Sequence, residues 1–244
     1  TIKMKFLSFC CLFISLTIQH VNAYTPVNNS YNIEQTEEER QKLKAFSSLN
    51  VSGPFEVELI ISHKSEIIIE GNKEAINNTL VLSKGKELAI AFKGKKKPNK
   101  LIKLTVYTSE LREIELKGKA EVYAPETIKG RSLSIQIAEH ASCYLDLDVE
   151  NLKCKLTGAA QMELTGTCKQ FAVETEDAAF LTCHELKAEK LSLKAKGASN
   201  SSVYAKNSLK VTASNAANIL YYGNPKQKDL KSVGAVRLEA NPKE

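Results

Sequence analysis

The chain has 244 residues, of which 25% are charged and 43% hydrophobic, as in ordinary folded proteins. It contains no Trp and few other aromatic residues, so its core must be built mainly from aliphatic side chains. A net charge of +6 does not indicate the concentrated basic face of a nucleic-acid-binding protein, and we expect no nucleic-acid partner.

The first 23 residues predict a secretory signal peptide. Lys5 precedes an apolar run from Phe6 to Ile18, and Val21 and Ala23 supply the small or aliphatic residues that a signal peptidase inspects. The run is shorter than the roughly 20 residues needed to cross a bilayer. No Cys lies near Ala23 to carry a lipid. We therefore expect cleavage after Ala23, export, and no transmembrane segment in the mature chain.

Residues 24–45 are polar and predict a flexible leader. Thr36 and Glu39 fit a helix capping box, and acidic residues precede basic ones, as a helix dipole prefers. A short helix over about Glu37 to Lys44 is the one element that this segment suggests.

Residues 46–110 carry the patterns of several strands. The runs alternate polar and apolar residues or are β-branched, and they are separated by turns such as Ser52-Gly53-Pro54. They are Phe46–Val51, Phe55–Ile61, Glu66–Glu70, Leu80–Leu82, Leu88–Phe92 and Leu101–Tyr107. We expect an antiparallel strand meander that caps the repeats following it.

One loop in this region holds the densest charge run of the chain: Lys93, Lys95, Lys96, Lys97 and Lys100. It is either a patch for an anionic surface, such as lipopolysaccharide, an acidic polysaccharide or nucleic acid, or a solvated loop. The lack of interleaved aromatic residues or Arg favours the solvated loop.

From Leu111 to Ala240 one short phrase recurs seven times, about every 19 residues. Each copy opens with Gly, Asn, Asp or Glu and has a small residue near its centre. The opening residues are Gly118, Glu139, Gly158, Asp177, Gly197, Asn215 and Gly234. A period of this length indicates a solenoid, and Gly, Asn and Asp suit a tight corner with positive φ.

Two apolar columns flank each copy of the phrase. Four residues before the opening residue stand Ile114, Ile135, Cys154, Val173, Leu193, Val211 and Leu230. Six residues after it stand Ala124, Leu145, Leu164, Cys183, Val203, Tyr221 and Ala240. Apolar and polar residues alternate with period two, which excludes helical repeats. We predict an all-β fold: a right-handed parallel β-helix of about seven rungs over residues 111–240, with a tail at 241–244.

The chain resembles the bacterial GIN domain, a family described as an auto-transporter adhesin head domain. Phe46-Ser47-Ser48-Leu49-Asn50-Val51 matches the family's opening Phe-x-x-Leu/Ile-x-Val segment, and residues 221–225 resemble its Tyr-x-Gly-x-Pro phrase. The resemblance covers residues 46–240 as one domain, although the corners here are Ala-rich where Gly and Ser are usual. It implies an adhesin-like role in the periplasm, at the bacterial cell surface or in the medium, and it supplies no catalytic residue.

Neither the cysteines nor the histidines predict a metal or cofactor site. Most cysteines of the mature chain fall in apolar positions and suit buried thiols, with disulfide pairing left open: Cys143, Cys154, Cys168 and Cys183. The histidines are scattered: His63, His140 and His184. We expect no cofactor.

Asp146, Asp148 and Glu150 form an acidic strip on one strand, and this strip is the one candidate for catalysis. Some β-helix enzymes cut polysaccharides with clustered carboxylates. Here two Thr and one Lys stand one rung further on, so no second carboxylate faces the strip.

Three functions therefore remain open. The first is adhesin-like recognition of a glycan or an envelope protein, without enzymatic activity. The second is a carbohydrate-active enzyme, a polysaccharide lyase or hydrolase, that uses the acidic strip. The third is a purely structural periplasmic protein. The sequence leaves the oligomeric state open.

Overall fold

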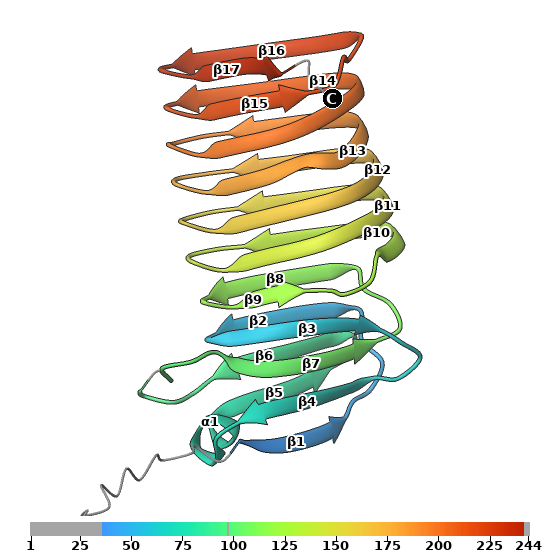
Figure 1. The fold of residues 1–244 in the computed structure, drawn as a ribbon, viewed down its shortest axis with the longest axis vertical. Helices are drawn as coiled ribbons and strands as arrows, with labels where there is room; N and C mark the ends of the chain where they lie inside the picture. The colour runs from blue at the N-terminus through green and yellow to red at the C-terminus, as the bar shows by residue number, and fades with distance from the viewer. Residues whose placement is uncertain (1–35, 97, 242–244) are drawn as a thin grey trace, which may run out of the picture. The chain divides into compact units, whose positions relative to one another are not determined.

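The computed structural model describes residues 36–96 and 98–241. The expected signal peptide, most of the leader and the last three residues lie outside this part. The described part is a β-solenoid of about seven turns with a curled sheet, as the sequence predicts (Figure 1). No helix among the described residues is long and apolar enough to cross a membrane.

Residues 36–96 and 98–123 form nine short strands and one helix. They are β1 (Glu37–Lys42), β2 (Ser48–Gly53), β3 (Phe55–Ile61), β4 (Glu66–Gly71), α1 (Lys73–Asn77), β5 (Thr79–Lys84), β6 (Glu87–Phe92), β7 (Ile102–Thr108), β8 (Glu113–Gly118) and β9 (Glu121–Tyr123). The second half is built mainly from longer strands. They are β10 (Ile128–Ile137), β11 (Ser142–Leu156), β12 (Gln161–Thr175), β13 (Phe180–Ala195), β14 (Asn200–Asn215), β15 (Asn218–Tyr222), β16 (Gln227–Gly234) and β17 (Arg237–Asn241).

The strands form two faces of the coil. Face 1 contains, in order of pairing, β5, β6, β2, β8, β10, the second halves of β11 to β14, and β16. Face 2 contains β1, β4, β7, β3, β9, the first halves of β11 to β14, β15 and β17. Each of the strands β11 to β14 therefore bends once, from face 2 to face 1, and a tight corner then returns the chain to face 2.

The tight corners are made by the recurring phrase. All seven predicted opening residues have positive φ, including the non-glycine residues Glu139 (65°), Asp177 (61°) and Asn215 (68°). Successive corners are joined through the backbone: the N–H of His140 donates to Gly118 at 3.1 Å, and the N–H of Ala159 donates to Glu139 at 2.7 Å. The small residue two places after the opening residue is fully buried in most corners, which lets them stack closely.

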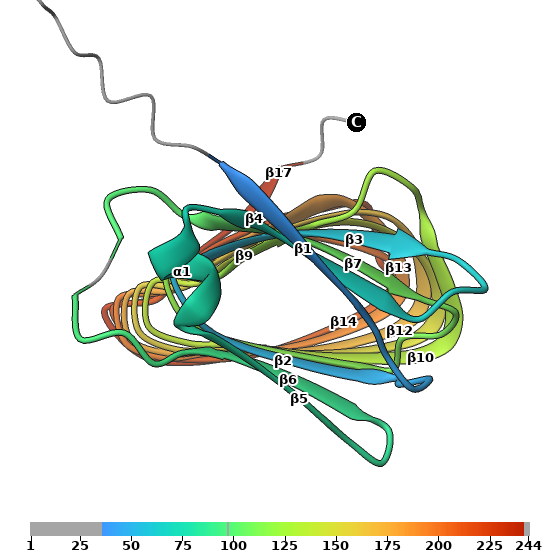
Figure 2. The ribbon, with the colours of Figure 1, turned by 90° about the horizontal axis from the view of Figure 1, so that it is seen from below.

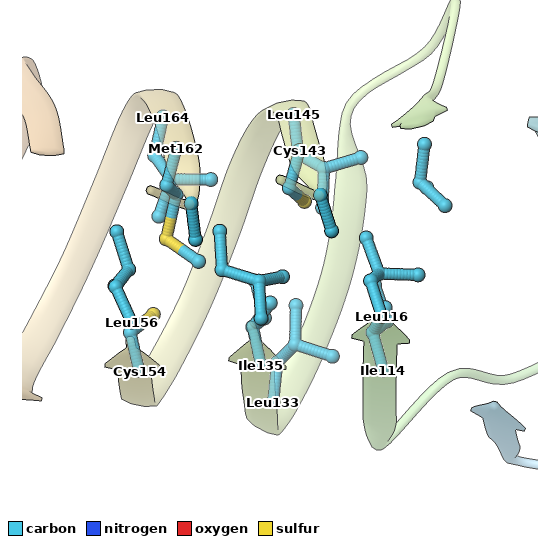
Figure 3. Packing of buried hydrophobic residues seen from close by; sticks show 14 of the residues in the cluster. Ile114, Leu116, Leu133, Ile135, Cys143, Leu145, Cys154, Leu156, Met162 and Leu164 are labelled. Atoms are coloured by element: carbon cyan, nitrogen blue, oxygen red, sulfur yellow. The ribbon is translucent and has the colours of Figure 1, made fainter. Parts of the chain in front are cut away.

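The two predicted columns line the interior. Ile135 pairs in register with Ile114 on one side and Cys154 on the other, and all three side chains are almost completely buried. Figure 3 shows Ile135 on face 1 and Cys143 on face 2 of the same turn, both among aliphatic side chains of the interior. Stacking at the spacing of paired strands, about 4.8 Å, thus produces one continuous aliphatic core.

The expected antiparallel meander over residues 46–110 is present only in part. Strands β4 and β5 pair antiparallel with β7 and β6, but β2 and β3 pair in parallel with strands on both sides. The β2–β3 unit is in fact a turn of the solenoid, inserted between the turn formed by β6 and β7 and the one formed by β8 and β9 (Figure 1). Its corner residue Gly53 pairs in register with Gly118.

The helix expected over Glu37 to Lys44 is wrong, because residues 37–42 form strand β1. The helix capping pattern of Thr36 and Glu39 does not decide the structure here, because β1 pairs antiparallel with the edge of β4, for example Arg40 with Ile68. Figure 2 shows β1 crossing the N-terminal end of the coil, with α1 beside it. Asn72 caps α1 by accepting from the N–H of Ala75 at 2.8 Å, and Ala75 and Ile76 are buried against the core. These elements lie over the N-terminal end of the coil.

Candidate functional site

A groove lies on the outer surface of face 1. It has a volume of about 530 Å³ and crosses the successive strands β10 to β14. Four strand spacings of about 4.8 Å make it roughly 19 Å long. We call it the axial groove. Its outward residues include Ser132, Ser134, Asn151, Lys153, Gln170, Ala172, Lys190, Ser192, Ser208 and Lys210, with Arg112 at one end.

The groove arises from the alternation of the strands. In each turn one buried residue, for example Leu152, points inward, and the two residues beside it, here Asn151 and Lys153, face outward. Parallel pairing stacks these outward residues in two rows across the turns. Ala172 and Ser192 are short, so the row that contains Lys153 and Lys210 is hollowed between the two lysines.

The charge of the axial groove is entirely positive. Lys153, Lys190 and Lys210 line it, no Asp or Glu does, and none of the three forms an ion pair within residues 36–96 and 98–241. Arg112 pairs with Glu110 at 2.7 Å. A concave surface lined by one sign of charge raises the local concentration of oppositely charged ligands.

Several lysines outside the groove are neutralised by the adjacent turn. Lys169 lies 2.8 Å from Glu150, Lys194 lies 2.7 Å from Glu174, and Lys196 lies 3.4 Å from Glu176. These pairs join successive turns on the solvent side. The groove lysines differ from them in forming no such pair: Lys153 and Lys190 have no carboxylate in register on either adjacent turn, and Asp229, in register with Lys210, pairs with Lys231 instead.

The acidic strip forms the same kind of link between turns. Asp146 accepts hydrogen bonds from Thr127, just before β10, and from Thr165 on β12. Asp148 accepts from Thr167 at 3.1 Å. The ion pair with Lys169 lowers the pKa of Glu150, chiefly through the hydrogen bond and secondarily through charge. A general acid of a glycosidase needs a raised pKa, so Glu150 is unsuited to that role.

A second hollow of about 530 Å³ lies beside the strip, and it has mixed charge. Asp148, Glu150 and Glu189 line it together with Lys169, Lys187 and Lys206. Glu189 is on β13, two strands from Glu150 on β11, with Lys169 on the strand between them. We did not find this second carboxylate from the sequence, because it lies two turns from Glu150 and the register of β12 with β13 shifts between Glu163 and Gly166.

The lysine loop lies at the corner between β6 and β7. Lys93, Lys95, Lys96 and Lys100 are exposed, and Lys97 lies outside the described residues. Since β6 and β7 belong to different faces of one turn, the loop is an enlarged corner and not a hairpin. None of the loop lysines lines the axial groove.

The cysteines and histidines form no metal-binding group within the described residues. All four described cysteines are free and buried. Burial raises the pKa of the thiols of Cys143 and Cys168 to about 12, so they are protonated and inert at neutral pH. His184 stacks on Tyr222 with a ring separation of 5.0 Å, and its Nδ1 lies 3.2 Å from the Ser202 hydroxyl.

Comparison with known protein families identifies the chain. Residues 45–225 match the model of the family described as "Putative auto-transporter adhesin, head GIN domain". The chain belongs to this family. A comparison of the GIN domain chain with curated protein sequences found no match.

Solved structures of similar fold come from Bacteroides and Parabacteroides species. An adhesin of Bacteroides fragilis, described as putative, is similar with a TM-score of 0.80 and 19% identity, covering 85% of this chain and 98% of its own. One from Parabacteroides merdae gives a TM-score of 0.68 at 17% identity, with 85% and 97% covered. A Parabacteroides distasonis protein described as a putative lipid binding protein gives 0.67 at 16%, with 84% and 96% covered. At these identities the similarity establishes the fold alone.

Proposed function

We propose that this GIN domain is an exported recognition module of the bacterial cell envelope, without enzymatic activity, that binds an extended anionic glycan along the axial groove. The family description as an adhesin head domain supports a role in surface recognition. The expected signal peptide supports export to the periplasm or the cell surface.

The single observation that carries this proposal is the distribution of lysines. The lysines of the axial groove have no carboxylate partner, whereas lysines on neighbouring positions are paired across turns. Three unpaired ammonium groups spread over three strand spacings, roughly 14 Å, fit carboxylate or sulfate groups repeated along a polymer. The hydroxyl and amide groups of Ser132, Asn151 and Gln170 add hydrogen-bonding groups for sugar hydroxyls.

The two alternative functions have less support. An enzyme that used the acidic strip would need a carboxyl group held in its protonated form, and the pKa of Glu150 is lowered. A purely structural protein would gain nothing from uncompensated cations gathered in one hollow. We therefore take polymer binding as the function that the geometry supports best.

The test is binding of the purified protein to acidic polysaccharides, namely polygalacturonate, alginate and heparin, with neutral dextran as the reference polymer. We expect saturable binding to at least one acidic polymer, weakened by salt because exposed charges are screened. The triple variant Lys153→Gln, Lys190→Gln, Lys210→Gln should lose roughly tenfold or more in affinity.

A matched control carries the same loss of charge in the lysine loop: Lys93→Gln, Lys95→Gln, Lys96→Gln. It should bind as the unmodified protein does. If the loop variant lost binding and the groove variant kept it, the site would be the loop and the groove proposal would be wrong. Release of reducing or unsaturated ends from any of the polymers, abolished by Asp146→Asn, would instead support the enzyme.

A further inference from the structure

The two ends of the solenoid differ in how they are covered. At the N-terminal end, α1 and the antiparallel strands β1, β4 and β5 close the coil. At the other end, all pairings of β16 and β17 within residues 36–241 run back to β14 and β15. No described strand pairs with the outer edges of β16 and β17, and unpaired strand edges are templates for pairing with another chain.

The interior is also exposed at this end. Leu230 continues the apolar column of Val211, yet it is 40% exposed while Val211 is 0% exposed. Leu238 continues the column of Ile219 and is only partly buried. Arrays of stacked repeats need their last apolar layer covered. The last turn thus offers both strand edges and the open end of the core.

The residues around these two leucines are self-complementary in charge. Leu230 lies between Asp229 and Lys231, and Leu238 lies between Arg237 and Glu239. An antiparallel copy of β16 centred on Leu230 places Asp229 opposite Lys231 of the second copy, and the reverse. Opposite charges in such cross-strand positions stabilise a pair of strands. In the isolated chain these groups pair with each other, at 3.9 Å and 2.8 Å.

One two-fold axis can serve both strands. Leu230 lies four residues before the corner residue Gly234, and Leu238 lies four residues after it. The equivalent residues of an earlier turn, Ile135 and Cys143, point into the interior from opposite faces (Figure 3). An axis normal to the faces that passes near Leu230 therefore also passes near Leu238. The same operation then pairs β17 with its copy and places Arg237 opposite Glu239 of the second copy.

We propose that the C-terminal end of the solenoid binds a second copy of this chain through antiparallel pairing of β16 with β16 and β17 with β17. This contact is isologous, so it closes as a two-fold dimer and does not propagate into a fibre. Both sheets and the core continue across the interface. Since the axis is normal to the faces, the axial grooves of both copies lie on the same side, which would favour bivalent binding of a polymer. The dimer itself does not depend on what the groove binds.

The test is sedimentation velocity of the full chain over roughly a hundredfold range of concentration, because assembly follows mass action. We expect the mass to rise from that of one mature chain to twice that value and no further. Two charge variants test the proposed register of β16 and β17 with their copies. The basic-edge variant Asp229→Lys, Glu239→Arg and the acidic-edge variant Lys231→Asp, Arg237→Glu should each remain monomeric, because like charges then face each other.

An equimolar mixture of the two edge variants should recover the dimer, because opposite charges again face each other. Lys129→Asp, a charge change on β10 away from the ends, should dimerise as the unmodified chain does. A monomer at every concentration, open-ended oligomers, or a mixture that stays monomeric would each overturn the proposal. The unmodified chain alone is decisive if the variants fail to fold.

Discussion

Lys169 on β12 lies 2.8 Å from Glu150 on β11, one turn of the solenoid away. The two residues are 19 positions apart in sequence, and the repeat period brings them side by side. Their ion pair assigns Glu150 to the links between turns. Lys169 thus has a carboxylate partner, whereas the lysines of the axial groove form no ion pair.

These ion pairs predict that acid destabilises the protein. Hydrogen bonds from Lys169 and Lys194 are the main cause of the lowered pKa of Glu150 and Glu174, relative to the usual 4.5. Because the folded-state pKa is lowered, the stabilisation is fully present above the unfolded pKa. It is lost as pH falls through the folded value. The melting temperature should therefore decrease as the pH is lowered below about 4.5. The melting temperatures of Glu150→Gln and of the unmodified protein should differ less at pH 3 than at pH 7. A difference independent of pH would contradict this assignment.

The interior columns predict a large cost for shortening a buried side chain. Ile135 is 0% exposed and contacts the same column on both neighbouring turns. Ile135→Ala should lower the free energy of unfolding by about 2–5 kcal/mol, measured by urea denaturation. Leu82→Ala is the control, because Leu82 on β5 is 54% exposed. It should cost less than about 1 kcal/mol, and equal costs at the two positions would argue against the stacked core.

The corners predict a difference between two glycines of positive φ. A methyl group at Gly197 would lie 2.8 Å from the carbonyl oxygen of Asp177 in the preceding corner, whereas one at Gly85 would meet no atom within 4 Å. Gly85→Ala should cost about 1 kcal/mol, the conformational penalty alone. Gly197→Ala adds a steric clash and should cost at least about 2 kcal/mol in urea denaturation. Similar costs would mean that the corners are not closely stacked.

Buried thiols predict slow alkylation. The thiol of Cys143 has a pKa raised to about 12 by burial, and the thiolate is the reactive form. Iodoacetamide at neutral pH should leave Cys143, Cys154, Cys168 and Cys183 unmodified in the folded protein and label all four in denaturant, as peptide mass mapping can show. Labelling of Cys143 in the folded state, or a disulfide between any two of the four, would contradict the structure.

The sequence predicts the repeated part of the fold well, because its signals are periodic. The opening residues from Gly118 to Gly234 all adopt positive φ, and the flanking columns stack in register. The β2–β3 turn was missed because parallel pairing of Leu49 with Leu88 and Ile114 joins distant segments. Gly53 was the residue that could have indicated this turn, since it occupies the same corner position as Gly118.

The candidate site was harder to predict than the fold. The sequence directed attention to the acidic strip and the lysine loop, which are local clusters. Lys153, Lys190 and Lys210 are far apart in the chain, and the parallel stacking of successive turns brings them into one groove. Aligning the turns places Ala172 and Ser192 between Lys153 and Lys210. That alignment shows the row, but not which of the neighbouring lysines lack a carboxylate partner.

The most direct test of the proposed function is calorimetric titration of the purified protein with polygalacturonate, beside the groove variant and the lysine-loop variant. We expect saturable, salt-sensitive binding that the lysine-loop variant retains. The variant Lys153→Gln, Lys190→Gln, Lys210→Gln should lose roughly tenfold or more in affinity. Equal affinity of the two variants for the polymer would contradict the assignment of the axial groove as the binding site.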